Sequence, residues 1–255
     1  GDPMPIDENR ERPIALIAFG GNALVPRGSD GNQEDQLREA ERFSEVVADL
    51  SRDHRLLLVH GNGPQVGHLL IQVEAGRGHV PPWPLDTCGA GSQGIIGYFL
   101  ETAIRSRLVS LGRPGRVSVL LTLTEVDPRD PAFDKPTKPI GPFYPPHIAR
   151  QLMERDGWRM VRQDLGWRRV VPSPEPLHVH GVEAMRTLLE ADHVVVTASP
   201  WTALNLFEDD DLPFDVRERI ALLADRRNKV AWLGYYIAAR EPVVALSERE
   251  LGAWF

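Results

Sequence analysis

Two short apolar runs, each followed at once by a glycine–asparagine turn, constrain the fold of this chain more than any other feature. Residues 14–19 are apolar throughout and end in Gly20-Gly21-Asn22, and residues 56–59 run into His60-Gly61-Asn62-Gly63. Short runs that are apolar throughout are typical of strands buried on both faces. Apolar residues at helical spacing follow each run, which gives the order strand, helix, strand, helix. This order predicts an α/β fold, a three-layer α/β/α sandwich around a mainly parallel sheet.

A proline-rich stretch interrupts the alternation. Residues 127–146 carry proline at short intervals, so they cannot form a helix or a central strand. We expect them to leave the sheet as a stiff, protruding arm. Further helices are expected at 34–50, 65–75, 89–111, 147–156, 183–190 and about 215–239, and further strands at 117–123, within 158–171 (a pair about Gly166), 193–197 and 242–246.

The charge and composition exclude several classes of protein. A formal net charge of −7 argues against a nucleic-acid partner, and neither a basic cluster nor an apolar run of about 20 residues points to a membrane. The single cysteine, Cys88, forbids an internal disulfide and fits a cytoplasmic location. We interpret Cys88 as a small buried residue rather than a nucleophile, since no histidine stands in a pairing position. The 8 histidines show no metal-ligand spacing, so no protein-bound metal is predicted.

The two glycine–asparagine turns are candidates for binding one small anion. In a doubly wound sheet, ligands lie outside the carboxyl ends of the strands, where both turns fall. Glycine lets backbone amides approach an anion closely, and asparagine adds a neutral amide donor. Either turn alone could be no more than a tight connection, but two at equivalent strand ends favour a shared cradle. The predicted cradle consists of Gly20, Gly21, Asn22, Gly61, Asn62 and Gly63.

Lysine is rare in this chain. Among its 29 basic residues only Lys135, Lys138 and Lys229 are lysines. Pro136 and Pro139 fix the backbone on either side of Lys138, so its ammonium could be aimed at a ligand with little ordering cost. The alternative for Lys138 is a surface lysine in a stiff linker.

Taken together, these segments resemble the carbamate kinases of the amino acid kinase family. The resemblance is continuous over about residues 14–198, and its motifs are long and in order. It rests on residues 18–24 (AFGGNAL), 60–67 (HGNGPQVG), 88–98 (CGAGSQGIIGY), 136–144 (PTKPIGPFY) and 168–174 (RRVVPSP). It implies the amino acid kinase fold and phosphoryl transfer between ATP/ADP and carbamate or carbamoyl phosphate. It also implies a homodimer.

The resemblance implies roles for individual residues. The turn Gly20–Asn22 would hold the transferred phosphoryl group, and the turn Gly61–Gly63 would bind the carbamoyl end. Lys138 would reach over the site and neutralise developing charge. Ser92 and Gln93 would contact the substrate, although Ser92 could equally cap the helix expected from residue 89. Carbamate is already an anion, so the step needs positioning and cations more than a general base.

The chain departs from the family pattern after residue 198. Family members carry a glycine run there, whereas residues 199–204 read Ser-Pro-Trp-Thr-Ala-Leu. An aspartate–lysine–aspartate stretch that meets the nucleotide phosphates and a later threonine–aspartate–valine turn are also missing. The resemblance therefore implies a shortened, divergent member that lacks most of the nucleotide-binding elements. Lys229 could be a retained phosphate contact or an ordinary lysine on a helix face.

These observations predict three parts of the chain. Residues 14–126 and 172–198 form the carbamate- and phosphate-binding core, residues 127–171 form the arm, and residues 199–255 form a reduced remnant of the nucleotide-binding lobe. A carbamate-kinase-like phosphotransferase is the first functional hypothesis, with ATP/ADP and Mg²⁺ bound in an altered way or with a partner chain completing the site. The alternative is a nucleotide-independent enzyme, or a regulatory subunit, that retains a carbamoyl-phosphate-type pocket.

Overall fold

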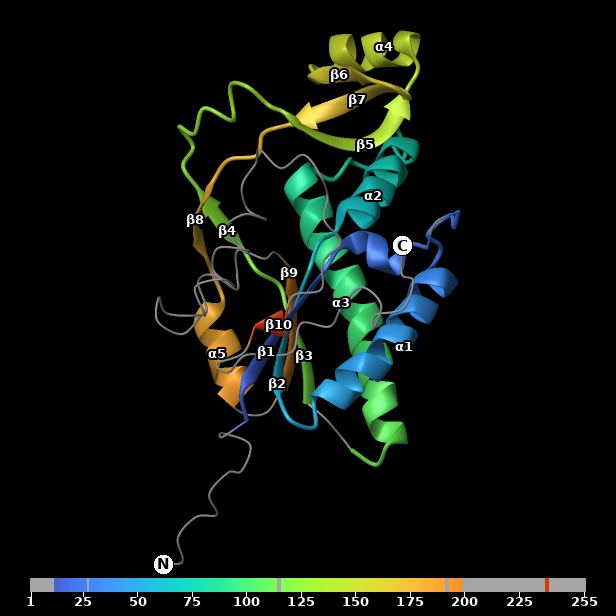
Figure 1. Cartoon of the computed structure of the whole chain (residues 1–255). Coiled ribbons are helices and arrows are strands. Elements are labelled where there is room, and N and C mark those ends of the chain that lie inside the picture. The colour runs from blue at the N-terminus through green and yellow to red at the C-terminus, as the bar shows by residue number, and fades with distance from the viewer. Residues whose placement is uncertain (1–11, 27, 114–115, 191–192, 199–236, 239–255) are drawn as a thin grey trace, which may run out of the picture. The chain divides into compact units, whose positions relative to one another are not determined.

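The computed structural model describes residues 12–26, 28–113, 116–190, 193–198 and 237–238 (Figure 1). Its elements in chain order are β1 (Ile14–Phe19), the 3₁₀ helix η2 (Gly21–Leu24), α1 (Gln33–Leu50), β2 (Arg55–His60), α2 (Gly63–Ala75), α3 (Leu85–Ser110), β3 (Arg116–Leu120), β4 (Thr124–Val126), β5 (Lys138–Tyr144), α4 (Pro146–Asp156), β6 (Met160–Gln163), β7 (Gly166–Val171), β8 (Pro176–Val179), α5 (Val182–Glu190), β9 (His193–Ala198) and β10 (Ile237–Ala238). They belong to two compact units. Of the described residues, the first takes in those within 12–62, 93–122, 181–198 and 237–238, and the second takes in residues 63–92 and 123–180.

The first unit is built around a five-stranded sheet with the order β10-β1-β2-β9-β3. β1, β2, β9 and β3 run parallel to their neighbours, while the short β10 pairs antiparallel with β1. β2 lies between β1 and β9, so both of its faces and both of its edges are covered. This position explains its unbroken apolar sequence and confirms the predicted mainly parallel sheet.

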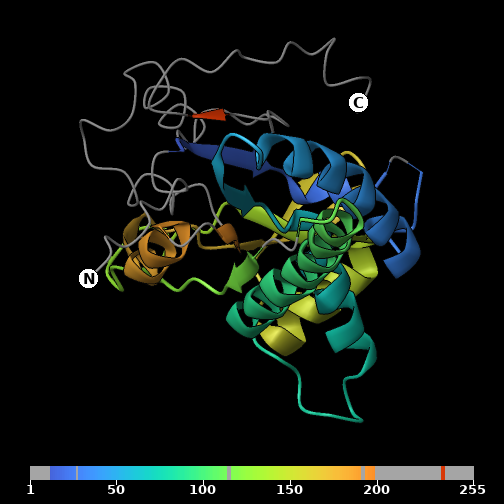
Figure 2. The ribbon, with the colours of Figure 1, turned by 90° about the horizontal axis from the view of Figure 1, so that it is seen from below.

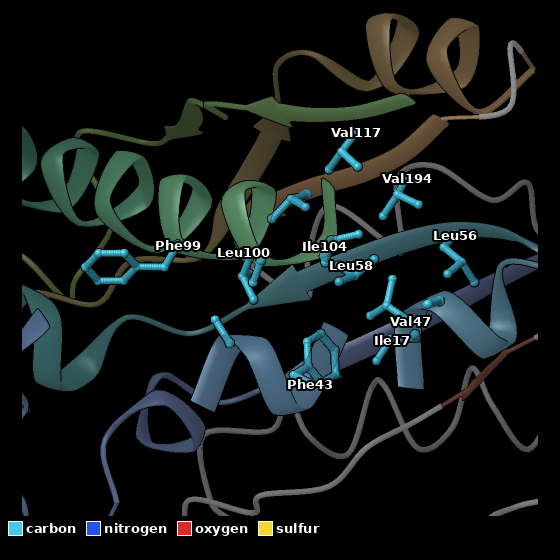
Figure 3. Close-up of a cluster of buried hydrophobic side chains, with 14 of the residues drawn as sticks. Ile17, Phe43, Val47, Leu56, Leu58, Phe99, Leu100, Ile104, Val117 and Val194 are labelled. Atoms are coloured by element: carbon cyan, nitrogen blue, oxygen red, sulfur yellow. The ribbon is translucent and has the colours of Figure 1, made fainter. Parts of the chain in front are cut away.

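Helices cover both faces of this sheet, because successive side chains of each strand point to opposite sides. On one face, strand residues pack against α1 and α3 in a cluster that includes Ile17, Phe43, Leu58, Ile104 and Val194 (Figure 3). On the other face, the intervening strand residues pack against α5 in a cluster that includes Leu16, Leu57, Met185, Leu189 and Val195. Figure 2 shows α5 across the sheet from α1 and α3. The three predicted layers are therefore confirmed.

One glycine of α3 is required by the packing of that helix on β3. A Cβ atom at Gly97 would overlap the side chain of Val119, whereas a Cβ atom at Gly94 would meet nothing within 4 Å. The absence of a side chain at Gly97 therefore lets the helix axis approach the sheet closely. The two glycines, one helical turn apart, have different structural roles.

The second unit contains a three-stranded antiparallel sheet with the order β5-β7-β6 and a separate pair, β4-β8. α2 packs against β5, and α4 packs against β7. β5 comes from the proline-rich stretch and is an edge strand of its sheet, which is where Pro139 and Pro142 can be accommodated without a missing ladder hydrogen bond. Within the described residues, no helix is long and apolar enough to cross a membrane.

The structure corrects several expected boundaries. α3 begins at Leu85 rather than at residue 89. The loop before it contains Pro81, Pro82 and Pro84, and the helix begins directly after the last of these prolines. The pairings of β5, β4 and β8 were not expected, because short edge strands depend on partners distant in the sequence. Residues 237–238 form a strand against β1 rather than the end of a helix. The remainder of the helix expected at 215–239, the strand expected at 242–246, and Lys229 lie outside the described residues.

The two units also divide the chain differently from the expected parts. Residues 63–92 were expected in the core because of their place in the sequence, but they belong with the arm residues in the second unit. The physical reason is the packing of α2 against β5, which sequence order does not reveal.

Candidate active site

The register of β1 and β2 brings the two glycine–asparagine turns together. Phe19 is paired with His60, and these are the last residues of two neighbouring parallel strands. The turns that follow therefore leave the sheet from the same edge and at the same level, about one strand spacing (~4.8 Å) apart. β9 ends beside them, since His60 is also paired with Ala198. Five residues of the predicted cradle, Gly20, Gly21, Asn22, Gly61 and Asn62, thus lie at one edge of one unit.

The first turn continues directly into the 3₁₀ helix η2. The carbonyl of Gly20 accepts a hydrogen bond from the N–H of Ala23 at 2.9 Å. The N–H groups at the start of such a helix have no acceptor inside it. Gly20 has ordinary extended angles, φ −77° and ψ 153°, so its backbone conformation does not by itself require glycine. The side chain of Asn22 is exposed and makes no hydrogen bond to other described residues.

His60, the last residue of β2, supports the second turn. Its side chain is 2% exposed, and its Nδ1 lies 3.2 Å from the carbonyl oxygen of Gly61. A carbonyl oxygen only accepts, so Nδ1 carries the proton in this contact. Burial lowers the pKa of His60 from 6.5 to about 4, despite a smaller opposing effect of the Gly61 carbonyl. His60 is therefore neutral near pH 7 and holds the turn without adding charge.

Gln93, in α3, tethers the chain that leaves β3. Its Nε2 donates to the carbonyl of Thr122 at 3.2 Å, and its Oε1 accepts from the N–H of Thr122 at 3.1 Å. Because β3 runs parallel to β9 and ends beside it, Thr122 follows the same edge of the sheet as the two turns. The carboxamide of Gln93 thus has a structural partner, and its substrate contact stays a prediction.

Three other predicted site residues belong to the second unit. Gly63 is the first residue of α2. Ser92 is buried well inside α3, and its hydroxyl donates to the carbonyl of Gly89 at 2.6 Å, so the helix cap considered for it is wrong. Lys138 is the first residue of β5, is exposed, and is paired with Val171 of β7.

No group of three or more His, Cys, Asp or Glu side chains among the described residues could hold a metal ion. The lone thiol, Cys88, is buried in α3, and burial raises its pKa, so the thiolate is disfavoured. The donors that the two turns themselves offer are their backbone amides and the carboxamides of Asn22 and Asn62.

Comparison with known proteins decides the family. Residues 13–206 match the amino acid kinase family. The chain belongs to the amino acid kinase family. This membership confirms the α/β fold and the resemblance that the motifs predicted.

The most informative relatives of this amino acid kinase family member are carbamate kinases. The carbamate kinase of Pyrococcus furiosus is 39% identical over 202 residues, which cover 77% of this chain and 64% of that protein. The carbamate kinase of Escherichia coli K12 is 42% identical over 181 residues, which cover 71% of this chain and 59% of that protein. The structure of carbamate kinase from Giardia lamblia bound to AMP-PNP matches with a TM-score of 0.68 and 34% identity over 74% of this chain and 60% of that one. The chain thus spans less than two thirds of the length of these relatives.

The sequence did not reveal that the side chains of His60 and Gln93 hydrogen-bond to the backbone of segments that leave this edge of the sheet. A signal for His60 was present, because a histidine that directly ends a fully apolar strand run is rarely solvated and needs an explanation. No comparable signal existed for Gln93, since its partner Thr122 is 29 residues away. Both residues act on the backbone of segments that leave the sheet.

Proposed function

We propose that this chain binds carbamoyl phosphate at the sheet edge formed by Gly20–Asn22 and Gly61–Asn62 and transfers its phosphoryl group to ADP, reversibly. The observation that carries this proposal is the pairing of Phe19 with His60, which sets the two turns side by side. The names of the similar proteins, all carbamate kinases, support the substrate class.

The transfer needs no protein-bound proton carrier. A terminal oxygen of the ADP β-phosphate forms a bond to phosphorus, and the bond from phosphorus to the carbamate oxygen breaks. Carbamate leaves as an anion and ADP attacks as an anion, so no proton changes place in this step. The barrier then depends on holding the two anions in line and on stabilising charge on the transferred phosphoryl oxygens.

Each predicted site residue has a task in this scheme. The backbone amides at Gly20 and Gly21, with the Asn22 carboxamide, hold the phosphoryl oxygens, and Gly61–Gly63 binds the carbamoyl end. Lys138 supplies the mobile positive charge, and Ser92 and Gln93 complete the substrate contacts. Mg²⁺ would enter with the nucleotide as part of the substrate complex.

The nucleotide and assembly parts of the proposal rest on the relatives. AMP-PNP is bound in the structure of the carbamate kinase from Giardia lamblia, which supports ATP/ADP as the second substrate. We assign residues 199–255, with Lys229 as a phosphate contact, to a reduced nucleotide-binding lobe. The protein acts in the cytoplasm as a homodimer, or with a partner chain that completes the site.

The direct test is the formation of ATP from carbamoyl phosphate and ADP, followed with luciferase. We expect ATP to form, and we expect Lys138→Ala to lower the rate. Lys135→Ala changes the matched exposed lysine of the same arm and should leave the rate unchanged. If the protein binds carbamoyl phosphate but forms no ATP, the proposed kinase activity is overturned. That result would favour a nucleotide-independent enzyme or a regulatory subunit. That alternative is supported by the Ser-Pro-Trp sequence at 199–201, where a glycine run would be needed.

A further inference from the structure

The second unit contains a cavity with no part in the proposed phosphoryl transfer. It has a volume of about 270 Å³ and is lined by α2, by the loop before α3, by β5 and by residues Trp158 and Arg169. None of the residues that line it belongs to the predicted anion cradle. Its size, just below the ~300 Å³ at which drug-sized pockets begin, suits a small molecule with one or two rings.

Most of the residues that line this cavity are apolar, and three of them are aromatic. The apolar residues are Leu70, Val73, Pro82, Trp83, Pro84, Leu85, Ile140, Pro142, Tyr144 and Trp158. The rings of Tyr144 and Trp158 meet edge to face, with centroids 6.2 Å apart. Trp83 is 66% exposed, so its indole ring is accessible to a ligand in this cavity. These surfaces would stack against a planar ring.

A single cation in the wall lacks a carboxylate partner. Arg169 lies on β7, the central strand, directly between Ile140 of β5 and Met160 of β6. Its guanidinium carbon lies 4.4 Å from the centroid of the Trp158 ring. It makes no hydrogen bond or ion pair with other described residues. Burial lowers the pKa of Arg169, which means that its charge is poorly solvated there.

The other charged groups at this cavity compensate one another. Glu74 lies 2.6 Å from Arg77 and 3.1 Å from Arg155. Asp156 lies 2.6 Å from Arg155 and 3.7 Å from Arg77. Two carboxylates and two guanidinium groups thus form a closed network with no net charge. Glu74 and Asp156 also act on the charge of Arg169, but without an ion pair. The two carboxylates and three guanidinium groups together leave one net positive charge at the cavity.

We propose that this cavity binds a small aromatic monocarboxylate, with its ring against Trp83 and Trp158 and its carboxylate on Arg169. A planar guanidinium pairs with a carboxylate through two parallel hydrogen bonds, which fixes the ring as well as the charge. A neutral ring would leave the charge of Arg169 uncompensated. A small anion without a ring would leave the aromatic walls uncovered.

The experiment titrates the full chain with 2-naphthoate by calorimetry and compares 2-naphthamide, a neutral molecule of the same shape, and acetate, an anion without a ring. We expect 2-naphthoate to bind about tenfold more tightly than 2-naphthamide, and acetate not to saturate. Arg169→Gln should abolish the preference for the carboxylate. Arg162→Gln, the matched exposed arginine on β6, should leave it unchanged.

Two further measurements test the aromatic contact and the independence of this cavity from the carbamoyl phosphate site. Trp83→Ala, at an exposed loop position that should not affect folding, should weaken the binding of 2-naphthoate and of 2-naphthamide by similar factors. Excess carbamoyl phosphate should leave the 2-naphthoate titration unchanged, whether or not the protein turns it over. The proposal is overturned if 2-naphthoate does not bind, if the amide binds as tightly, if Arg169→Gln folds and keeps the preference, if Trp83→Ala changes neither affinity, or if carbamoyl phosphate competes.

Discussion

The two units of this chain present positive potential to ligands in different ways. In the first unit, the predicted cradle consists of backbone amides and two asparagines, Asn22 and Asn62, and the pairing of Phe19 with His60 places its two halves. In the second unit, the positive charge is a guanidinium, Arg169, stacked on Trp158. Strand register holds backbone amides at little entropic cost, whereas a long side chain must be held by packing. Each half of the first arrangement is a contiguous sequence motif, whereas the second brings together single residues that are distant in the sequence.

The largest expected effect tests whether a side-chain charge is needed in addition to the backbone cradle. Lys138→Ala should lower kcat for ATP formation by about 100-fold or more, the usual effect of removing a group that stabilises transition-state charge. Steady-state kinetics with the luciferase assay would measure it. Lys135→Ala should stay within about twofold of the wild type, and equal losses in the two variants would mean that arm lysines act only through general electrostatics.

A second prediction concerns the histidine that holds the second turn. The pKa of His60 is about 4 in the folded protein and near 6.5 when unfolded, so the unfolded chain binds more protons between these values. The contribution of neutral, buried His60 to the free energy of unfolding is therefore complete above pH 6.5. It is lost as the pH falls toward 4, which lowers that free energy by up to about 3 kcal/mol. Urea unfolding of wild type and His60→Asn at several pH values would show this as a difference between the two curves. Parallel curves would contradict the assignment.

A third prediction separates two glycines of one helix in the first unit. Gly97→Ala should lower the free energy of unfolding by about 1–3 kcal/mol, because the new methyl group overlaps Val119. Gly94→Ala, in open space one turn away, should raise it by up to about 1 kcal/mol through helix propensity. Thermal or urea unfolding would compare them, and a shift of the same sign in both variants would contradict the close contact of α3 with β3.

The smallest expected effect concerns the polar side chain of the first turn. Asn22→Ala should weaken carbamoyl phosphate binding by about fivefold to tenfold, because the loss of one exposed hydrogen bond costs about 1 kcal/mol. Its control is Asn32→Ala. Asn32 accepts a hydrogen bond from the N–H of Asp35 at 2.9 Å as the cap of α1, so its loss should cost about 1 kcal/mol of stability and no affinity. Equal affinities of Asn22→Ala and the wild type would exclude Asn22 from the cradle.

The difference between the units also explains what the sequence could predict. The runs 14–19 and 56–59 specify buried strands by composition alone, and the turns after them could be placed because parallel strands end at a common edge. The grouping of α2 with the arm and the edge strand β5 could not be predicted, since both depend on packing between distant segments. The same holds for the cavity, whose residues run from Leu70 to Arg169 and share no local pattern.

The site residues show the same limit in detail. Ser92 was expected at a helix start because glycines surround it, but α3 begins at Leu85, directly after Pro84. His60 stands in the sequence at the end of an apolar run, but its burial follows from its place between β1 and β9. Sequence patterns thus identified which backbone segments carry the chemistry, while the groups that hold those segments required the structure.

The central claim, that two neighbouring turns bind one anion through their amides, is tested most directly by NMR. The protein would be labelled with ¹⁵N at glycine and asparagine and titrated with carbamoyl phosphate. We predict that the amide signals of Gly20, Gly21, Gly61 and Asn62 shift together and fit a single Kd. Shifts confined to one turn, or two turns that titrate with different Kd values, would contradict the claim.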